Sequence, residues 1–271
     1  MKSKAIQQII VGVDFSRYSK LVVKEAQKLA KAMKIPLRYV YVNDVFQFVG
    51  EPREVAEKKL TEKVYKFYKL KKDTDVVIRT GDAPEQLIEA AKASQLSPLI
   101  MVGHKGMGAI ARFLLGSTAE RVALLSPFPV WIHRGQKVLL PKKILVPSDF
   151  SKHTDTTLNQ VQSFDKAFQS NLELFHVIQE PTPVVDLPIY SLVYQQIHSD
   201  DDRSFEDFKK SHPNYKTVRD VGEVAEQVEE RSRKFDLVAF SPRGKGESTP
   251  FLGRVAAKLV RSGNKPVLIC P

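Results

Sequence analysis

Short apolar runs alternate along the chain with longer segments whose apolar residues recur at helical spacing. The first run, residues 9–13, is rich in β-branched residues, as expected of a strand buried on both faces of a parallel sheet. Ser16 follows and is a suitable cap for the next helix. In the first half the pattern predicts strands at 9–13, 37–42, 76–80, 99–102 and 130–133, and helices after Ser16 and at 55–68, 84–93 and 117–125. This alternation predicts an α/β fold with a doubly wound, open sheet.

The same pattern occurs twice. Asp14 and Asp149 close similar strands 135 positions apart, and Leu99 and Leu237 begin similar strands 138 positions apart. The closing strands also match, at 127–132 and 265–269. These near-constant offsets indicate a duplicated domain. We therefore predict two tandem domains, residues 1–137 and 138–271, each a mostly parallel five-stranded sheet with helices on both faces.

A glycine-rich stretch, residues 103–118, follows the fourth predicted strand. Glycines allow backbone amides to approach a phosphate without a Cβ in the way. At its end, Gly116, Ser117 and Thr118 open the next helix, whose unpaired N–H groups and positive dipole end favour an anion. In a doubly wound sheet, ligands bind beyond the carboxyl ends of the strands, where this stretch is expected.

Here the chain resembles the universal stress protein family, in particular its ATP-binding branch. The signature of that branch is Gly, two residues, Gly, nine residues, Gly, and then Ser or Thr. Gly103, Gly106, Gly116 and Ser117 fit it without a gap. The resemblance covers essentially the whole chain as two domains and implies the adenine-nucleotide alpha-hydrolase-like fold.

The resemblance also implies a set of nucleotide contacts. Val13 and Asp14 are expected beside the adenine and ribose, Val42 to offer backbone groups to the adenine, and Gly103, Gly106, Gly116, Ser117 and Thr118 to hold the ribose and phosphates. Lys105 stands where family members often have histidine and is expected beside the phosphates. The implied ligand is ATP or a related adenine nucleotide, with or without Mg²⁺. Structural alternatives stay open, because Asp14 could cap a turn, Val42 could be core, and the loop could be a tight connection without a ligand.

The second copy of the loop has lost this pattern. It has Ser241 for the first glycine, only eight residues between Gly244 and Gly253, and Arg254 and Val255 in place of the Ser-Thr pair. Pro242 and Pro250 remove two backbone donors. Asp149 persists, but we expect no tight ATP binding in this half.

After a predicted strand at 172–177, prolines at 181, 183 and 188 precede an apolar stretch, residues 189–194. We interpret this stretch as irregular. It is expected to cover the vacant crevice of the second domain, with the admission of a nonpolar ligand as the alternative.

The net charge of +11 lies entirely in the first half. Residues 1–137 hold 24 Lys and Arg against 13 Asp and Glu, whereas residues 138–271 hold 18 of each. A basic field attracts anionic partners. A solvated lysine-rich helix explains the excess, so we do not expect a nucleic-acid partner.

Several other classes of site and protein are set aside. There is no Gly-x4-Gly-Lys-Ser/Thr sequence of a P-loop, and the histidines show no metal-ligand spacing. Ser117 has no evident histidine base, so no catalytic residue is assigned. Cys270 is the single cysteine, and the run at 9–13 is too short for a membrane span. We expect a cytoplasmic protein without a membrane segment.

These patterns favour an ATP-binding regulatory protein of the stress response, with slow or no ATP hydrolysis. One alternative is a scaffold or ligand-binding protein whose second domain binds a protein or a nonpolar ligand. Another is an enzyme that transfers adenylyl or phosphoryl groups, although no reactive element for it is evident. The resemblance also implies pairing of the closing strands, because in the family the last strand of each domain pairs across a two-fold dimer. Here the strands at 130–133 and 266–270 are expected to make that contact within one chain, which gives a pseudo-dimeric monomer or a dimer of such units.

Overall fold

The computed structural model describes residues 5–43, 52–104, 116–135, 137–138, 140–179, 188–244 and 252–271. For residues 188–195 and 197 it describes the backbone alone. The central glycine-rich segment, 105–115, therefore lies outside the described residues, and with it Lys105 and Gly106.

The first half contains the predicted strands and helices, with ends that differ by at most two residues. They are β1 (Gln8–Val13), α1 (Arg17–Met33), β2 (Leu37–Asn43), α2 (Arg53–Tyr68), β3 (Val76–Thr80), α3 (Ala83–Lys92), β4 (Pro98–Gly103), α4 (Ser117–Leu125) and β5 (Val130–His133). Ser16 caps α1 as predicted, because its side chain accepts a hydrogen bond from the Ser19 amide at 3.0 Å. Pro84 lies in the first turn of α3, where its missing N–H is not needed.

The second half repeats this order. Its elements are β6 (Lys143–Pro147), α5 (Lys152–Phe168), β7 (Asn171–Ile178), α6 (Pro188–Ser211), β8 (Lys216–Val221), α7 (Val224–Ser232), β9 (Leu237–Phe240), α8 (Arg254–Ser262) and β10 (Val267–Ile269). The interpretation of residues 189–194 as irregular is wrong, because they form the first turns of α6. Ile189, Leu192 and Val193 have helical spacing, and Pro188 is tolerated at the first helical position.

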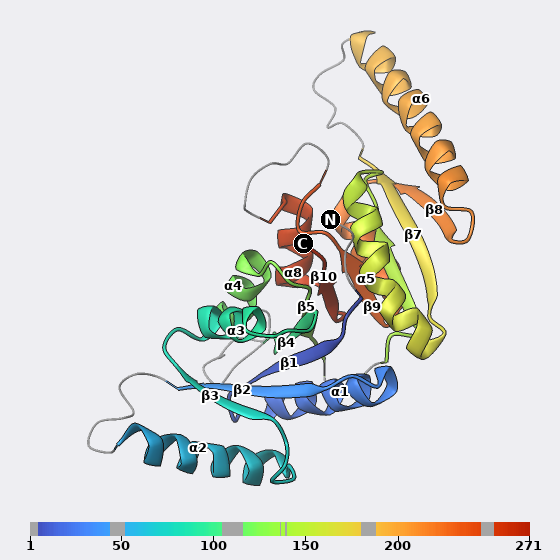
Figure 1. Ribbon diagram of the computed structural model, residues 1–271. Coiled ribbons are helices and arrows are strands. Elements are labelled where there is room, and N and C mark those ends of the chain that lie inside the picture. The colour runs from blue at the N-terminus through green and yellow to red at the C-terminus, as the bar shows by residue number, and fades with distance from the viewer. Residues whose placement is uncertain are drawn as a thin grey trace.

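The two halves form one continuous sheet of ten strands, in the order β3-β2-β1-β4-β5-β10-β9-β6-β7-β8. The two closing strands β5 and β10 pair antiparallel, with Trp131 opposite Leu268, while the other neighbours are parallel. This confirms the pairing within the chain that the family resemblance implied. Figure 1 shows the resulting arrangement, in which the blue-to-green half and the yellow-to-red half meet along β5 and β10.

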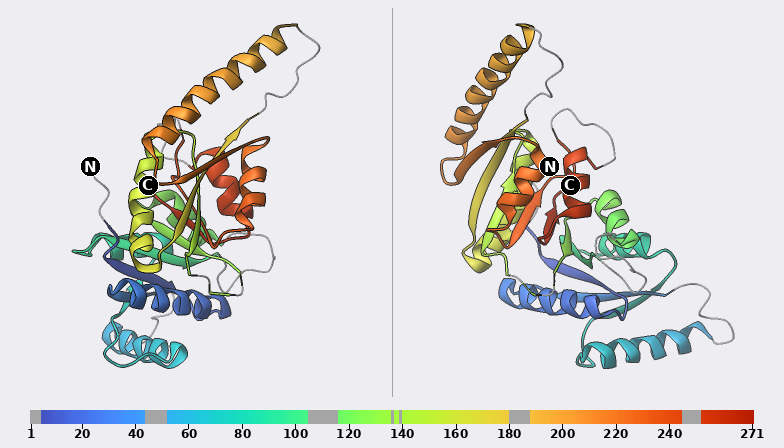
Figure 2. Two further views of the ribbon diagram at one scale, coloured as in Figure 1. Left: turned by 90° about the vertical axis from the view of Figure 1, so that its right-hand side faces the viewer. Right: turned by 180° about the vertical axis from the view of Figure 1, so that it is seen from behind.

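Helices cover both faces of this sheet. One buried cluster joins α1 and α5 to one face, and the other joins α3, α4, α7 and α8 to the opposite face. The halves share their core, since Trp131 on β5 is fully buried with its ring 5.6 Å from that of Phe164 on α5. The C-terminal part of α6 contributes Phe205 and Phe208 to the core, whereas its N-terminal part extends beyond the sheet (Figures 1 and 2).

The direction of winding reverses twice. In the first half β1 lies between β2 and β4, and in the second half β6 lies between β7 and β9. At such a switch point the connections leave in opposite directions and open a crevice beyond the carboxyl ends of the strands. The fold thus places one candidate crevice after β1 and β4, and another after β6 and β9.

Candidate functional site

A tight turn ends β1. The Ser16 amide donates to the Asp14 carboxylate oxygen Oδ1 at 3.0 Å, and Phe15 between them has a φ of 61°, in the left-handed region. A non-glycine residue in this region is uncommon and marks a locally constrained backbone. Asp14 therefore has the turn-capping role that the sequence left open, and the turn fixes its carboxylate at the strand end.

Aromatic side chains hold this turn. The Phe15 amide donates to the Tyr68 hydroxyl at 3.1 Å, and the Phe15 ring lies 4.7 Å from that of Tyr41. Burial, followed by the charge of Asp14, raises the pKa of Tyr41 above its ordinary value. Burial likewise raises the pKa of Tyr68, so both phenols stay neutral at physiological pH. Lys63 lies 4.7 Å from the centre of the Phe15 ring, which brings a cation close to the turn.

The two ends of the glycine-rich stretch meet. The Gly116 amide donates to the His104 carbonyl at 2.7 Å, and the His104 amide donates to the His133 carbonyl at 3.1 Å. Gly116 is the N-cap of α4 and makes no side-chain capping bond. Ser117 is exposed and begins α4. The N-terminal amides of α4 are thus brought to the carboxyl end of β4.

The described part of the predicted site lies at one edge of the sheet. Val13 pairs with Tyr41, next to Val42, and β1 and β4 run parallel toward Asp14 and Gly103. Val13 is buried, so only its backbone could meet a ligand, while Val42 is half-buried. Gly116, Ser117 and Thr118 approach this edge at the start of α4. Lys105 and Gly106 lie outside the described residues, and the contacts assigned to all of these residues stay predictions.

The second half keeps the same backbone frame. The Ser151 amide donates to Asp149 Oδ1 at 3.1 Å, and Phe150 has the same φ of 61° as Phe15. The Gly253 amide donates to the Pro242 carbonyl at 2.8 Å, as Gly116 does in the first half. The duplication is therefore preserved in hydrogen bonding even where the sequence of the loop has changed.

Pro242 does not remove a phosphate donor, contrary to the sequence-based expectation. Pro242 aligns with His104, whose amide donates to the neighbouring strand at His133 rather than into the crevice. The proline therefore removes a hydrogen bond of the sheet, not a donor for a phosphate. Pro250 lies outside the described residues.

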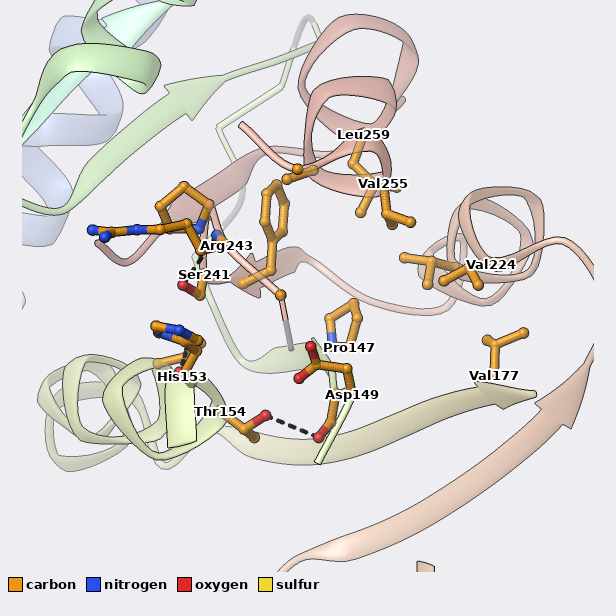
Figure 3. A pocket seen from close by; sticks show the side chains of 18 of the residues that line it. Pro147, Asp149, His153, Thr154, Val177, Val224, Ser241, Arg243, Val255 and Leu259 are labelled. Atoms are coloured by element: carbon orange, nitrogen blue, oxygen red, sulfur yellow. Dashed lines mark hydrogen bonds between the residues drawn. The ribbon is translucent and has the colours of Figure 1, made fainter. Parts of the chain in front are cut away.

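A cavity of about 300 Å³ occupies the crevice of the second half. Its described lining comes from β6, α5, β7, α7, β9, α8 and their connections, and no lining residue in this set belongs to α6. Asp149 and Val177, the counterparts of Asp14 and Val42, both line it. Figure 3 shows Asp149 between a polar side with His153 and Ser241 and an apolar side with Val177 and Val224. The side chains of residues 189–194 are not among the described ones, and their expected role as a cover of this crevice stays a prediction.

The comparisons with known proteins agree with this duplication. The model of the universal stress protein family matches residues 5–134 and again residues 141–271. The chain belongs to the universal stress protein family.

Some relatives match along nearly the whole chain and others along about half of it. A universal stress protein of Mycolicibacterium smegmatis is 25% identical over 96% of both chains. One from Methanocaldococcus jannaschii is 29% identical and covers 48% of this chain and 84% of its own. Among solved structures, a universal stress protein from Archaeoglobus fulgidus has a TM-score of 0.67 at 20% identity, covering 97% of each chain. A functionally unknown protein from Pseudomonas aeruginosa reaches 0.70 at 12% identity, covering 97% of this chain and 92% of its own. At these identities the structures show the shared fold.

A buried polar network supports the first site and was missed in the sequence. Glu25 on α1 is fully buried, and its Oε2 accepts from Trp131 Nε1 at 2.9 Å and from His133 Nδ1 at 2.7 Å. The His133 carbonyl also accepts a hydrogen bond from the His104 amide. This network therefore fixes the end of β4, where the glycine-rich stretch of this universal stress protein begins. The signal was present, since Glu25 lies on the apolar stripe of α1 between Val22 and Leu29.

Proposed function

We propose that this universal stress protein binds ATP or a related adenine nucleotide in its first half and acts as a nucleotide-dependent regulatory protein of the stress response. Hydrolysis is slow or absent, and no residue is assigned a catalytic role. We place the protein in the cytoplasm and divide it into domains at residues 137 and 138. No helix in the described part of the chain is long and apolar enough to cross a membrane.

One observation carries this proposal. The hydrogen bond from Gly116 to His104 brings the N-terminus of α4, without a side-chain cap, to the sheet edge that Asp14 also borders. Unpaired N–H groups at a helix N-terminus stabilise an anion. In the proposal the amides near Gly116 and the hydroxyls of Ser117 and Thr118 hold phosphates, while Asp14 and the backbone of Val42 meet the ribose and adenine.

The residues outside the described ranges complete the proposed site. Lys105 and Gly106 belong to the glycine signature and would add a cation and an approachable backbone beside the phosphates. Mg²⁺, where it accompanies the nucleotide, would be held mainly by the phosphate oxygens, as is usual for this ion. The residues of the proposed site would bind and orient the nucleotide and stabilise the negative charge of its phosphates.

Two equivalent glycines provide a matched test. Gly116 has φ −67° and ψ 141°, and Gly253 has φ −57° and ψ 155°, so valine meets no positive-φ strain at either position. We expect Gly116→Val to remove copurified nucleotide and Gly253→Val to leave it, as read by native mass spectrometry at one nucleotide per chain. Nucleotide retained by the folded Gly116→Val protein would count against the proposed site. Turnover of added ATP at ordinary enzyme rates would instead favour an enzyme that transfers adenylyl or phosphoryl groups.

A further inference from the structure

The cavity in the second half has a rigid apolar wall. Six of its side chains are at most 7% exposed and come from β7, α7, β9 and α8: Phe175, Val177, Val228, Phe240, Ala256 and Leu259. Such a wall excludes hydrogen bonding over most of its area and favours a ligand with an apolar body. Val255 extends it, at the position where the first half has Thr118.

Charged side chains also line the cavity. Among the described lining residues these are Arg243, Arg254 and the carboxylate of Asp149, apart from two histidines. Both arginines are exposed, and in the described part of the chain neither forms an ion pair. Arg254 makes a long hydrogen bond of 3.4 Å to Gln179. The Asp149 carboxylate is engaged by the Ser151 amide in its turn.

We propose that this cavity binds a small amphipathic monoanion, with its apolar body against the wall of β7, α7, β9 and α8 and its carboxylate at Arg254. The guanidinium group matches a carboxylate through paired, parallel hydrogen bonds. A carboxylate brings one negative charge to Arg254, whereas a triphosphate brings several and finds Arg254 and Val255 where the first half has two hydroxyls. The two halves thus select different ligands with one fold. Figure 3 shows Val177, Val224 and Val255 on one side of the cavity and His153 and Ser241 on the other.

The test uses hexanoate, octanoate and 1-octanol as probes, with isothermal titration calorimetry on the full chain. We expect one saturable octanoate site, with binding about four-fold tighter for each added methylene, because each one leaves water for the apolar wall. Octanoate should bind more tightly than 1-octanol. Equal affinity of hexanoate and octanoate, or no saturable binding of octanoate, would overturn the proposal.

Three variants assign the site. Arg254→Gln should weaken octanoate about ten-fold and leave 1-octanol unchanged, while Arg233→Gln, an exposed arginine outside the cavity lining, should change neither. Val255→Phe should abolish binding of both probes by filling the cavity. Full octanoate affinity in folded Val255→Phe, or an equal loss in both arginine variants, would refute the assignment. The Gly116→Val protein should bind octanoate normally, which separates this proposal from the one for the first half. ATP bound in the second-half cavity would contradict the proposal made here for that cavity.

Discussion

Removal of the Glu25 carboxyl group should lower the free energy of unfolding by more than the loss of one hydrogen bond would. Glu25 Oε2 accepts from both Trp131 and His133, and all three side chains are fully buried. Glu25→Ala leaves two buried donors without an acceptor, at about 1–3 kcal/mol each, or about 2–6 kcal/mol in total. That is a large part of the about 5–15 kcal/mol by which a typical domain is stable.

Urea unfolding at neutral pH, followed by circular dichroism, measures this loss. With a slope of about 1–3 kcal/mol per molar urea, the midpoint should fall by about 0.7 M or more. Glu89→Ala on α3 is the matched control, because Glu89 is exposed and pairs only with exposed Lys92 among the described residues, so it should change stability by less than about 1 kcal/mol. Similar midpoints for the two variants would refute the buried network as a source of stability.

Two further predictions concern buried groups in the second half. Burial raises the pKa of the Cys270 thiol, so this thiol should not react with a thiol reagent at pH 8 in the native protein. The reagent should label it only as urea unfolds the chain, and rapid labelling of the native protein would contradict this. Burial alone raises the pKa of Glu173, but hydrogen bonds and charges from Arg231 and Lys216 outweigh it and hold this pKa below the ordinary value. The stabilisation from Glu173 is therefore present above the ordinary carboxyl pKa and is lost as pH falls through the lowered one. Glu173→Gln should lower the urea midpoint at pH 7. It should also reduce the difference between the urea midpoints at pH 7 and pH 4, and an unchanged difference would show that Glu173 does not contribute to the loss of stability in acid.

The fold was largely predictable because its signals are local or repeated. The β-branched run at 9–13, the cap at Ser16 and the proline at 84 each act within a few residues, and the structure confirms them. The pairing of β5 with β10 was expected from the family resemblance and not from a local pattern. In the structure it covers one open edge of each half and leaves β3 and β8 at the ends of the sheet.

The features that were missed depend on tertiary packing. The start of α6 was interpreted as irregular because prolines dominate the preceding segment, although Pro188 itself is compatible with a helix start. The cavity in the second half depends on side chains from six elements, and no local pattern specifies the space between them. Glu25 lies on an apolar stripe, but its partners are more than 100 residues away in the sequence.

The central claim is that the first half alone binds an adenine nucleotide. A crystal structure of the full chain with ATP tests it most directly. We expect one nucleotide per chain, with its phosphates at the N-terminus of α4 beside Gly116 and its base toward the ends of β1 and β2. ATP in the second-half cavity, or side chains filling the first crevice so that no nucleotide enters, would contradict it.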